Sequence, residues 1–437
     1  MSNRREFLKQ LALGVTSLTI LPSWTISNGV RIAPSDRIVL GFIGLGRQGV
    51  SDFHSFSHCP EVYVAGGCDV DKTKQLRFKR VVESWQKGKE VASRCDLYES
   101  YEELLNRKDI DAISIATPDH WHALTSIHSC EAGKHVYVQK PLAFTVREGL
   151  EITKAVRDNN RVLQVGSQQR SSEEFQKAIY LVKSGAIGQI KTIYARVGEP
   201  PTPLDLPKQA VPESLNWDKW LGPLNDPNIH YHPDLCPPIS LDPKIDEKLW
   251  GAWRWYRETG NGYIADWGAH MFDIAQAAIG MDGSGPTEFI PKGYNNTPHL
   301  TMKYDNGVVM TEQEYREQGG QGVRFNGDNG WIEVGRGSIN CSDPSLLERK
   351  EKHIGEGEYE ISSSHMQNFI DAIKLGKDPI APVEVGCSTN TLCCIANIAT
   401  ELERPVKWDP KLLSFGNDLE ASNHRLYDYI YRKPYSL

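Results

Sequence analysis

Three polar residues in this sequence are of the types that acid/base chemistry uses. Lys140 follows an apolar stretch, whereas Asp266 and His270 stand four positions apart in a later stretch with a helical apolar pattern. Residues four apart are neighbours on a helix, so the aspartate and the histidine would share one face. Oxidation of an alcohol by hydride transfer needs a base for the hydroxyl proton and a cation for the developing alkoxide. Lys140 and His270 are the residue types that such a reaction requires.

Asp273 lies three positions after His270 and leaves two other interpretations of this segment open. One is a capped helix with a hydrogen-bonded core histidine. The other is metal binding, although a single helix without a further His or Cys pair offers few ligands. In the acid/base interpretation His270 is the principal base, Lys140 is a hydrogen-bond donor and proton relay, and Asp266 orients the substrate hydroxyl. The sequence is equally compatible with the reverse assignment, in which Lys140 is the base and His270 is the hydrogen-bond donor.

A glycine-rich loop near the start of the chain would hold the cofactor for such a reaction. An apolar run breaks into Gly44-x-Gly46-x-x-Gly49, the pattern of a strand, a tight turn and a helix start. Gly44 would make the turn, Gly46 would let the backbone approach a pyrophosphate, and Gly49 would let the helix pack closely on the strand. The phosphates would lie at the helix N-terminus. The predicted cofactor-binding residues of this loop are Gly44, Leu45, Gly46, Arg47 and Gly49.

An acidic residue follows at the spacing of a dinucleotide site. A β-rich run over residues 61–68 ends in Asp69, 20 positions beyond Gly49. A carboxylate there hydrogen-bonds the adenosine ribose and repels the additional phosphate of NADP, so NAD is the favoured cofactor. Three basic residues could instead neutralise that phosphate; these are Lys72, Lys74 and Arg77. An alternative role for Asp69 is to cap the helix that starts at Asp71.

The chain then alternates strands and helices at the spacing of a parallel sheet. Predicted helices cover 50–57, 71–85, 101–106 and 123–132, and predicted strands cover 110–116 and 134–138. This order implies right-handed crossovers and a doubly wound α/β domain. Thr117 and Pro118 end one strand and open a crevice at its carboxyl end, where such sheets bind ligands. Both are predicted cofactor contacts, with His122 shaping the same loop.

This order of motifs resembles the glucose–fructose oxidoreductase / inositol dehydrogenase / MocA family. The shared features are the glycine loop, the acidic residue, Ala-Thr-Pro-x-x-x-His and Gly-Lys-His-Val-Tyr-Val-x-Lys-Pro. The family's usual Glu-Lys-Pro appears here as Gln139-Lys140-Pro141, which removes a carboxylate but keeps hydrogen-bonding capacity. The resemblance implies a Rossmann NAD-binding domain at residues 36–160, with Gln139 and Lys140 beside the cofactor.

The resemblance also implies a second, α+β domain over residues 161–437, for substrate binding and oligomerisation. In it Asp266 and His270 face the nicotinamide. Residues 287–334 alternate strands with Gly or Asn-Gly turns, which is typical of an open, mainly antiparallel sheet. An open sheet leaves a face to cover, so a homodimer or homotetramer is expected. The tail from Val406 is expected to pack back on the first domain. Further predicted elements are strands at 162–166 and 190–197 and helices at 171–184, 266–279, 365–375 and 389–402.

A proline-rich segment lies between the two candidate site regions. Eleven of the 25 prolines fall between residues 200 and 243, which predicts irregular loops, and long loops in a compact domain are usually functional. Six of the eleven tryptophans fall between residues 217 and 267. Tryptophans mostly fill cores, but a few can offer flat faces to a sugar ring. Trp253 is therefore a predicted substrate contact, and Arg170, just past a strand, is a second one.

Composition and the N-terminus limit the partners and the compartment. A formal net charge of −7 without a long basic run argues against nucleic acid and anionic membrane surfaces. Arg4-Arg5-Glu6-Phe7-Leu8-Lys9 followed by an apolar run resembles a twin-arginine export signal, although Asn3 replaces the usual Ser or Thr; a helical tail is the alternative. We expect residues 1–30 to be this signal. The mature protein is then expected to be periplasmic and to have no membrane span. The nine cysteines are expected to be mostly buried free thiols.

Together these features predict an exported, NAD-dependent oxidoreductase. Its substrate would be a secondary hydroxyl of a sugar, cyclitol or glycoside, and its NAD would stay bound because free NAD is scarce outside the cytoplasm. One alternative is a glycoside-cleaving enzyme that uses bound NAD for transient oxidation of the sugar. Another is a non-catalytic exported carbohydrate-binding protein.

Overall fold

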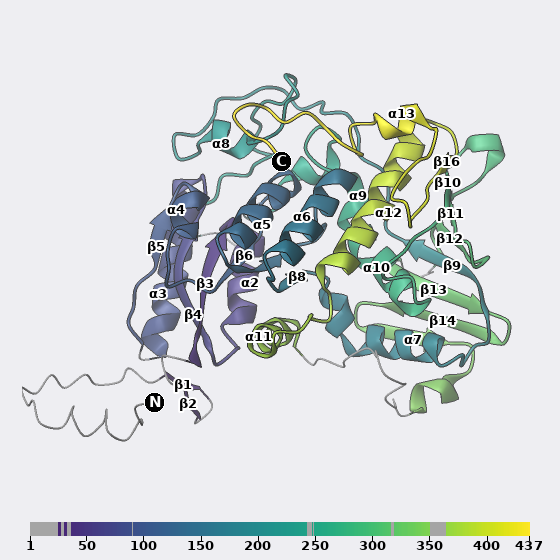
Figure 1. The fold of residues 1–437 in the computed structure, drawn as a ribbon, viewed down its shortest axis with the longest axis horizontal. Coiled ribbons are helices and arrows are strands. Elements are labelled where there is room, and N and C mark those ends of the chain that lie inside the picture. Colours follow the sequence, from purple (N-terminus) through teal and green to yellow (C-terminus); the bar gives the residue numbers. More distant parts are fainter. Residues whose placement is uncertain are drawn as a thin grey trace, which may run out of the picture.

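The structure is a computed structural model that describes residues 25–27, 30–32, 36–89, 91–242, 247, 249–315, 319–349 and 364–437. The predicted export signal lies outside these residues, except where it overlaps a small two-stranded sheet of β1 (Thr25–Ser27) and β2 (Val30–Ile32). Two larger sheets define two domains, which lie on the left and the right of Figure 1.

Six parallel strands form the first sheet, in the order β5-β4-β3-β6-β7-β8. They are β3 (Ile38–Ile43), β4 (Val62–Cys68), β5 (Asp96–Tyr98), β6 (Ala112–Ile115), β7 (His135–Val138) and β8 (Leu163–Val165). The helices between them are α2 (Arg47–Phe56), α3 (Lys72–Gly88), α4 (Tyr101–Leu105), α5 (His122–Glu131) and α6 (Val146–Asp158). Most residues of the central strands are buried and apolar, because helices cover both faces. The strand order reverses between β3 and β6, which is where doubly wound sheets bind ligands.

The domain boundary predicted at residue 161 is too early. β8 pairs in parallel with β7 and so completes the first sheet instead of starting the second domain. The helix α11 (His365–Leu375) also belongs to this side of the molecule, although it comes late in the sequence. Its residues Met366, Phe369 and Ile370 share a hydrophobic cluster with strand and helix residues of the first domain.

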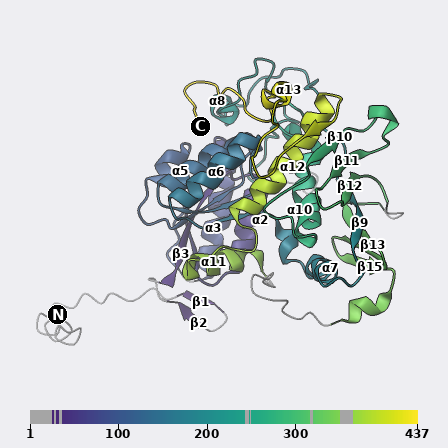
Figure 2. The same cartoon turned by 45° about the vertical axis from the view of Figure 1, so that its right-hand side comes forward.

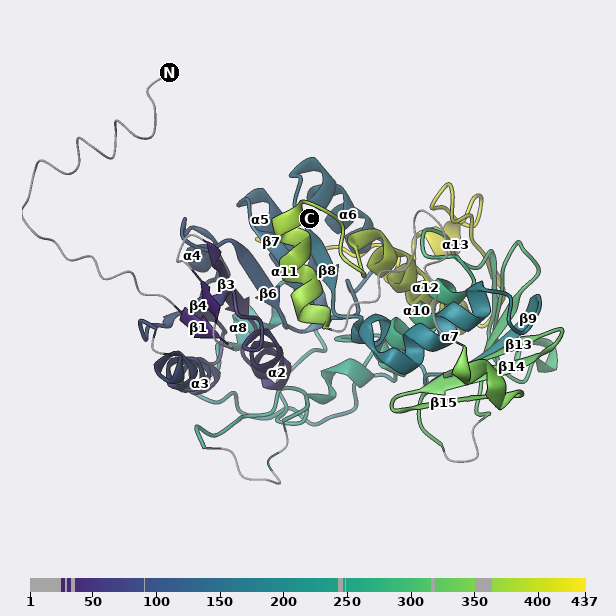
Figure 3. The same ribbon diagram turned by 90° about the horizontal axis from the view of Figure 1, so that it is seen from below.

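The second sheet has eight strands, in the order β15-β14-β13-β9-β12-β11-β10-β16. All neighbours are antiparallel except β9 and β12, as predicted for a mainly antiparallel sheet. The strands are β9 (Ile190–Arg196), β10 (Glu288–Ile290), β11 (Leu300–Lys303), β12 (Val309–Glu312), β13 (Gly322–Gly327), β14 (Gly330–Gly335), β15 (Ser338–Cys341) and β16 (Val406–Lys407). Figures 2 and 3 show its helices on the side that faces the first domain.

Those helices bury an apolar face against the second sheet. They are α7 (Glu173–Lys183), α10 (Gly268–Ala278) and α12 (Val383–Glu401). Their residues and those of the strands form one hydrophobic cluster, which includes Phe175, Phe272 and Phe325, all three with no exposed surface. α12 also packs along α6 of the first domain, so the second domain is anchored beside the first.

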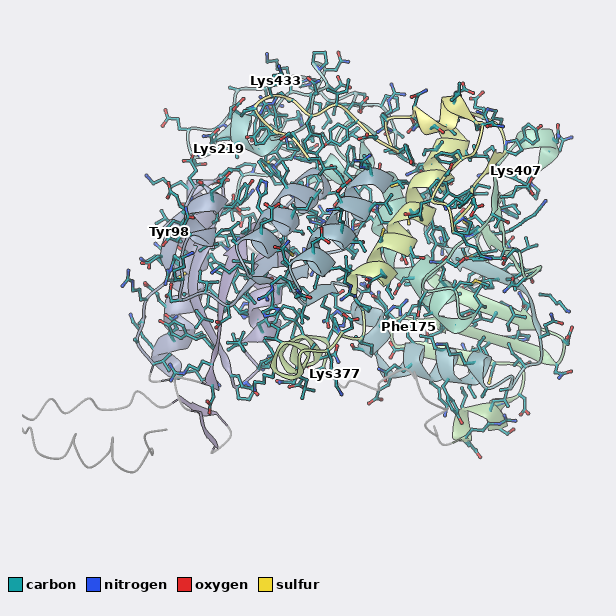
Figure 4. The ribbon with its side chains drawn as sticks, viewed as in Figure 1. Tyr98, Phe175, Lys219, Lys377, Lys407 and Lys433 are labelled. Carbon is teal, nitrogen blue, oxygen red and sulfur yellow. The ribbon has the colours of Figure 1, made fainter. Side chains whose placement is uncertain are left out.

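The proline-rich segment and the C-terminal tail both lie over the carboxyl edge of the first sheet (Figure 1). The segment contains the short helix α8 (Trp217–Leu221), whose Lys219 pairs with Glu99 at 3.0 Å, close to Tyr98 at the end of β5 (Figure 4). The tail follows α13 (Leu419–Ser422), and its Tyr435 ring contacts the Trp121 ring edge-on at 5.3 Å. Both segments therefore restrict access to this edge.

Two further predictions can be compared with the fold. All nine cysteines are free thiols and eight of them are buried, which confirms the expectation from their number and spacing. Among the helices that the structure describes, none is long and apolar enough to cross a membrane.

Candidate active site

A cleft of about 420 Å³ opens at the carboxyl edge of the first sheet. Its walls come from the loops after β3, β4 and β6, from residues 235–239 of the proline-rich segment and from residues 249–254. The predicted cofactor and substrate residues that line it are Gly44, Gly46, Arg47, Asp69, Thr117, Pro118 and Trp253. The cleft therefore lies at the point where the strand order predicts a ligand.

The backbone of the glycine loop is packed so closely that side chains at two of its glycines would not fit, and a side chain at the third would occupy open space. Gly44 has φ +85°, and a Cβ there would lie 2.6 Å from the backbone of Ala116. A Cβ on Gly49 would lie 2.0 Å from the carbonyl oxygen of Gly44, whereas Gly46 has open space around it. No side chain caps the first turn of α2, so its N–H groups remain as donors. This arrangement fits a pyrophosphate at the helix N-terminus.

Asp69 is held by the backbone at the ribose end of the cleft. Its Oδ2 accepts from the N–H of Leu45 at 2.7 Å and its Oδ1 from the N–H of Asp71 at 2.9 Å. Burial raises the pKa of Asp69, while the charge of Lys74 and these backbone donors act in the opposite direction. Asp71 caps α3, since its carboxylate accepts from the N–H of Thr73. The carboxylate of Asp69 is therefore not required as the helix cap.

Gln139 lies where the family resemblance expects a glutamate, and a carboxylate from another element lies beside it. The Nε2 of Gln139 donates to both oxygens of Asp52 on α2, at 2.8 and 3.0 Å, and Gln48 donates to the same group at 2.8 Å. Asp52 is 1% exposed, and burial raises its pKa to about 7. A neighbouring helix thus supplies a carboxyl group beside position 139, and Gln139 is buried against it.

Lys140, which follows β7 of the first domain, connects the two domains through its side chain. Its Nζ lies 2.5 Å from Oδ1 of Asp266 and 2.9 Å from the backbone oxygen of the same residue. Arg254, in the turn Ala252–Trp255, also approaches Asp266, with Nε 3.6 Å from Oδ1. Burial works to raise the pKa of Asp266, but the charges of Lys140 and Arg254 outweigh it and the pKa is lowered. Asp266 is therefore a carboxylate at neutral pH.

His270 lies beside this pair and is held by Gln169 and Arg336. With the Gln169 amide oriented to satisfy its neighbours, its oxygen accepts from Arg336 Nη2 and Nε at 2.8 and 3.0 Å, and its nitrogen donates to His270 Nδ1 at 2.5 Å. Burial lowers the pKa of His270 well below its usual value, and the charges of Lys140 and Arg336 lower it further. His270 is therefore neutral, with its proton on Nε2.

The segment around His270 differs from the single helix predicted from residue 266. Helix α9 (Gly262–Asp266) ends at Asp266, and α10 begins after Trp267. Asp266 and His270 still lie together, but Asp273 does not share their surroundings. Its oxygens accept from Arg170 Nε and Nη2, both at 2.8 Å. The two aspartates thus belong to two separate ion pairs, and His270 accepts from Gln169, an arrangement unlike a shared metal site.

Arg170 is a structural residue instead of the predicted substrate ligand. Its guanidinium is 2% exposed and pairs with Asp273 at 2.8 Å and with Asp282 at 2.6 Å. Burial acts to lower its pKa, yet the two carboxylates outweigh it and raise the pKa well above the usual value. This ion pair fixes the residues just before α7 against α10.

Of His122 and Trp253, only Trp253 lines the cleft. The ring nitrogens of His122 face the carbonyl oxygens of Pro141 and Thr117 at 2.8 and 3.0 Å, so this residue fixes the loop beside the cofactor. Trp253 is 7% exposed, and the Arg254 guanidinium stacks on its ring at 4.2 Å. Trp253 lies in the wall of the dinucleotide cleft, and its contact with substrate stays a prediction.

Several residues of the site were not found from sequence. Asp52 stands four positions after Gln48, a helical spacing that could have identified it. Arg254 lies in the tryptophan-rich window that was assigned to core. Arg336 occupies the Gly-Arg-Gly turn between β14 and β15, and only the tertiary fold brings it to His270.

The fold and the cleft define a dinucleotide-binding oxidoreductase architecture, and family comparisons agree. The sequence matches the model of an oxidoreductase family with an NAD-binding Rossmann fold over residues 38–167. It matches the C-terminal alpha/beta domain of the same oxidoreductase family over residues 199–437. The chain belongs to the Gfo/Idh/MocA family, and its first domain is an NAD-binding Rossmann domain.

Curated relatives resemble part of the chain. An alpha-N-acetylgalactosaminidase from Shewanella oneidensis is 33% identical over 207 residues, which is 43% of this chain and 44% of that protein. A protein of glycosyl hydrolase family 109 from another Shewanella is 32% identical over 207 residues, with the same coverage. The match thus spans less than half the length of these relatives.

Solved structures share the fold over most of the chain. An aldose-aldose oxidoreductase from Caulobacter crescentus, complexed with glycerol, has a TM-score of 0.54 at 16% identity, covering 85% of this chain and 99% of its own. A levoglucosan dehydrogenase, in complex with NADH and levoglucosan, has a TM-score of 0.55 at 17% identity with the same coverage. At this level of identity the likeness concerns the fold alone.

Proposed function

We propose that this protein uses a tightly bound NAD to oxidise a secondary hydroxyl of a sugar, cyclitol or glycoside. The observation that carries the proposal is the contact between Lys140 and Asp266, which joins the NAD-binding domain to the second domain beside a neutral His270. When bound, NAD supplies the hydride acceptor. The chain supplies the groups that bind the hydroxyl and handle its proton.

The geometry favours one of the two role assignments left open by the sequence. Because Gln169 donates to Nδ1, His270 presents an N–H at Nε2 and acts as a hydrogen-bond donor to the substrate oxygen. Lys140 then serves as the base in its neutral amine form, whose two N–H groups donate to Asp266 at two points while the lone pair takes the hydroxyl proton. His270 and Lys140 would thereby hold the reacting oxygen from opposite domains.

A second candidate function is cleavage of a glycoside, which the names of the curated relatives favour. Oxidation of a ring carbon to a carbonyl makes the neighbouring C–H acidic. Lys140 would remove that proton, and the glycosidic C–O bond would break as the electron pair moves to the leaving group. Water addition and return of the hydride would make the net reaction a hydrolysis.

We also propose that the protein is exported by the twin-arginine route with NAD already bound, since that route carries folded proteins. The twin arginines at positions 4 and 5 motivate this. The cleft lies beneath the proline-rich segment and the tail, which would slow release of the cofactor. Fractionation of cells that express the full chain tests the location: a cytoplasmic protein would contradict it.

One experiment separates the chemical versions. Purified protein is incubated with a panel of glycosides without added NAD, and the products are identified by mass spectrometry. Stoichiometric oxidised sugar supports the oxidoreductase, whereas catalytic release of aglycone supports the glycoside-cleaving enzyme. If no sugar is changed and Lys140→Ala binds sugars as the native protein does, the protein is a carbohydrate-binding protein. Mass spectrometry of the denatured protein identifies the cofactor.

A further inference from the structure

One residue of the C-terminal tail lines the dinucleotide cleft. Tyr435 forms part of the cleft wall together with Tyr101, at the start of α4, and Trp121, just before α5. The Trp121 ring meets the Tyr435 ring edge-on at 5.3 Å and the Tyr101 ring edge-on at 5.8 Å. Figure 4 shows Lys433 of the tail and Lys219 of α8 at this edge of the first domain. Three aromatic rings, one of them from the tail, therefore meet in one part of the cleft.

The order of the groups in NAD places its adenine beside these rings. The pyrophosphate belongs at the N-terminus of α2 and the adenosine ribose at Asp69. Since the adenine is bonded to that ribose, it lies next to Asp69 on the side away from the pyrophosphate. The backbone N–H of Asp69 donates to the carbonyl oxygen of Tyr98 at 3.2 Å, and the cleft-lining residues 99–102 follow directly. Tyr101 is one of them, so the aromatic cluster lies at the adenine end of the cleft.

The tail is attached to the loop after α8 through Arg432. The Nε of Arg432 donates to the carbonyl oxygen of Gly222 at 3.0 Å, and Nη2 donates to the backbone oxygen of Asp218 at 2.8 Å. The Nη1 pairs with the carboxylate of Asp218, and the backbone N–H of Arg432 donates to Pro223 at 2.9 Å. Because the N–H of Tyr435 donates to the carbonyl oxygen of Arg432 at 3.0 Å, Tyr435 belongs to the same anchored turn.

Two further contacts hold this part of the tail in place. The hydroxyl of Tyr431 donates to Oε1 of Glu148 on α6 at 2.5 Å, and Glu148 is buried. Gly222, which accepts from Arg432, also lies directly against the ring of Trp121: a Cβ on Gly222 would lie 2.3 Å from that ring. The anchor of the tail and the aromatic cluster are therefore packed together. A ring that is already fixed loses little conformational entropy when a ligand binds to it.

We propose that Tyr435 binds the adenine of NAD, so that the C-terminal tail is part of the cofactor site. The inference rests on the NAD-binding domain and not on the reaction in the proposed function. Aromatic side chains suit this task, because every nucleobase has a flat π-face and excludes water against a ring. Arg432 is a positioning residue, since it holds the turn that carries Tyr435. The tail thereby slows the release of NAD.

The first test measures the exchange of bound NAD in the full chain. Protein loaded with isotope-labelled NAD is mixed with excess unlabelled NAD, and the label that stays bound is followed by mass spectrometry. Tyr435→Ala should release NAD about tenfold faster, whereas Tyr435→Phe keeps the ring and should stay within about twofold of the native rate. Ile430→Ala is the matched control, because Ile430 lies in the same tail with 83% of its surface exposed. It should leave the rate unchanged.

The second test separates the adenine from the rest of the cofactor. Calorimetric Kd values are measured for ADP-ribose and for nicotinamide mononucleotide, which has no adenine, with protein freed of cofactor. Tyr435→Ala should weaken the binding of ADP-ribose about tenfold and leave that of nicotinamide mononucleotide unchanged. Arg432→Met should change the two values in the same direction. A variant that only destabilises the fold would weaken both ligands.

Each outcome decides the inference. Unchanged NAD exchange in Tyr435→Ala overturns it, and so does an equal loss of affinity for the two ligands. If Tyr435→Ala does not fold, amide hydrogen exchange of the native protein decides. Added AMP should then slow the exchange of residues 426–437, because coupling between two contacts is reciprocal, and no effect of AMP overturns the inference. These measurements involve no sugar, so they are independent of whether the proposed oxidation takes place.

Discussion

The amide nitrogen of Gln139 lies 2.8 and 3.0 Å from the two carboxylate oxygens of Asp52. This contact joins the end of β7 to the helix that follows the glycine loop. It explains how the motif Gln-Lys-Pro can replace Glu-Lys-Pro at Lys140, because the carboxyl group of Asp52 lies beside position 139. A glutamate at position 139 would instead put two carboxylates within hydrogen-bond distance.

The first prediction concerns a variant that restores glutamate at position 139. Gln139→Glu should lower the free energy of unfolding by about 1–3 kcal/mol, since a buried hydrogen bond is replaced by a repulsive pair. Adding Asp52→Asn should recover most of that loss, because the amide and the carboxylate then change places. Thermal or chemical unfolding of both single variants and the double variant measures the coupling. Additive effects of the two changes would contradict it.

The second prediction concerns the pH dependence of Asp52. Burial raises its pKa in the folded protein to about 7, from 3.8, so the folded state holds this proton more tightly than the unfolded state does. Its contribution to stability is complete below pH 3.8 and is lost as the pH rises toward 7. The native protein should therefore lose stability relative to Asp52→Asn by at most about 1.4 kcal/mol per pH unit in this range. Unfolding curves of both proteins at several pH values test it, and a parallel pH dependence would refute it.

The third prediction tests the preference for NAD. Asp69→Asn keeps the size of the side chain but removes the charge that repels a 2′-phosphate. NADP should then bind about tenfold more tightly or better, while NAD weakens because the ribose loses a charged acceptor. Fluorescence titration of protein freed of cofactor gives both Kd values. Unchanged discrimination would show that Asp69 does not select the cofactor.

The fourth prediction concerns Arg170. Arg170→Met leaves Asp273 and Asp282 without their buried partner and should lower the free energy of unfolding by about 3–5 kcal/mol. Arg157→Met is a matched control: Arg157 also pairs with two carboxylates, Asp378 and Glu384, but all three are exposed. That control should cost about 0–1 kcal/mol. Equal losses for the two variants would show that burial does not decide the effect.

The fifth prediction concerns the hydrogen-bonded state of His270. In the variant Gln169→Glu the new carboxylate has only acceptors. It would accept from Arg336 and also from an N–H at Nδ1 of His270. The ring proton should move to Nδ1, Nε2 should become an acceptor, and kcat should fall about tenfold or more. Nitrogen NMR of labelled histidine reads the tautomer directly. An unchanged tautomer with a reduced kcat would contradict the assigned role.

The sequence was sufficient for the first domain because its signals are local. Three local signals each predict one structural feature: the glycines of the loop, the carboxylate after β4 and the proline after β6. The position of the cleft could therefore be predicted from the sequence alone. Lys140 was placed by the same reasoning. The helical spacing of Asp266 and His270 placed these two residues on one face, but that they meet the cofactor site of Lys140 was inferred only from the family resemblance, since a contact across 126 positions leaves no periodic signal.

The parts that could not be predicted depend on tertiary contacts. Arg170 follows a strand, as substrate-binding residues often do, but Asp273 and Asp282 bury its charge. The strand β8 was predicted to begin the second domain, because the sequence of a strand does not indicate which sheet it joins. In the structure it pairs with β7 of the first sheet. Arg336 reaches Gln169 only when the hairpin β14–β15 is folded against α7. Which charged residues from distant positions meet in space can be identified only from the structure.

The central claim is that Lys140 and Asp266, from different domains, form one site that oxidises a sugar with bound NAD. Rapid mixing of the NAD-loaded protein with the preferred sugar, followed by the absorbance of reduced nicotinamide, tests it. Native protein and the exposed-lysine control Lys154→Met should show reduction in a single turnover. Lys140→Met and Asp266→Asn should retain NAD by mass spectrometry but reduce it about a hundredfold more slowly or worse. Reduction at the native rate in either variant would contradict the account.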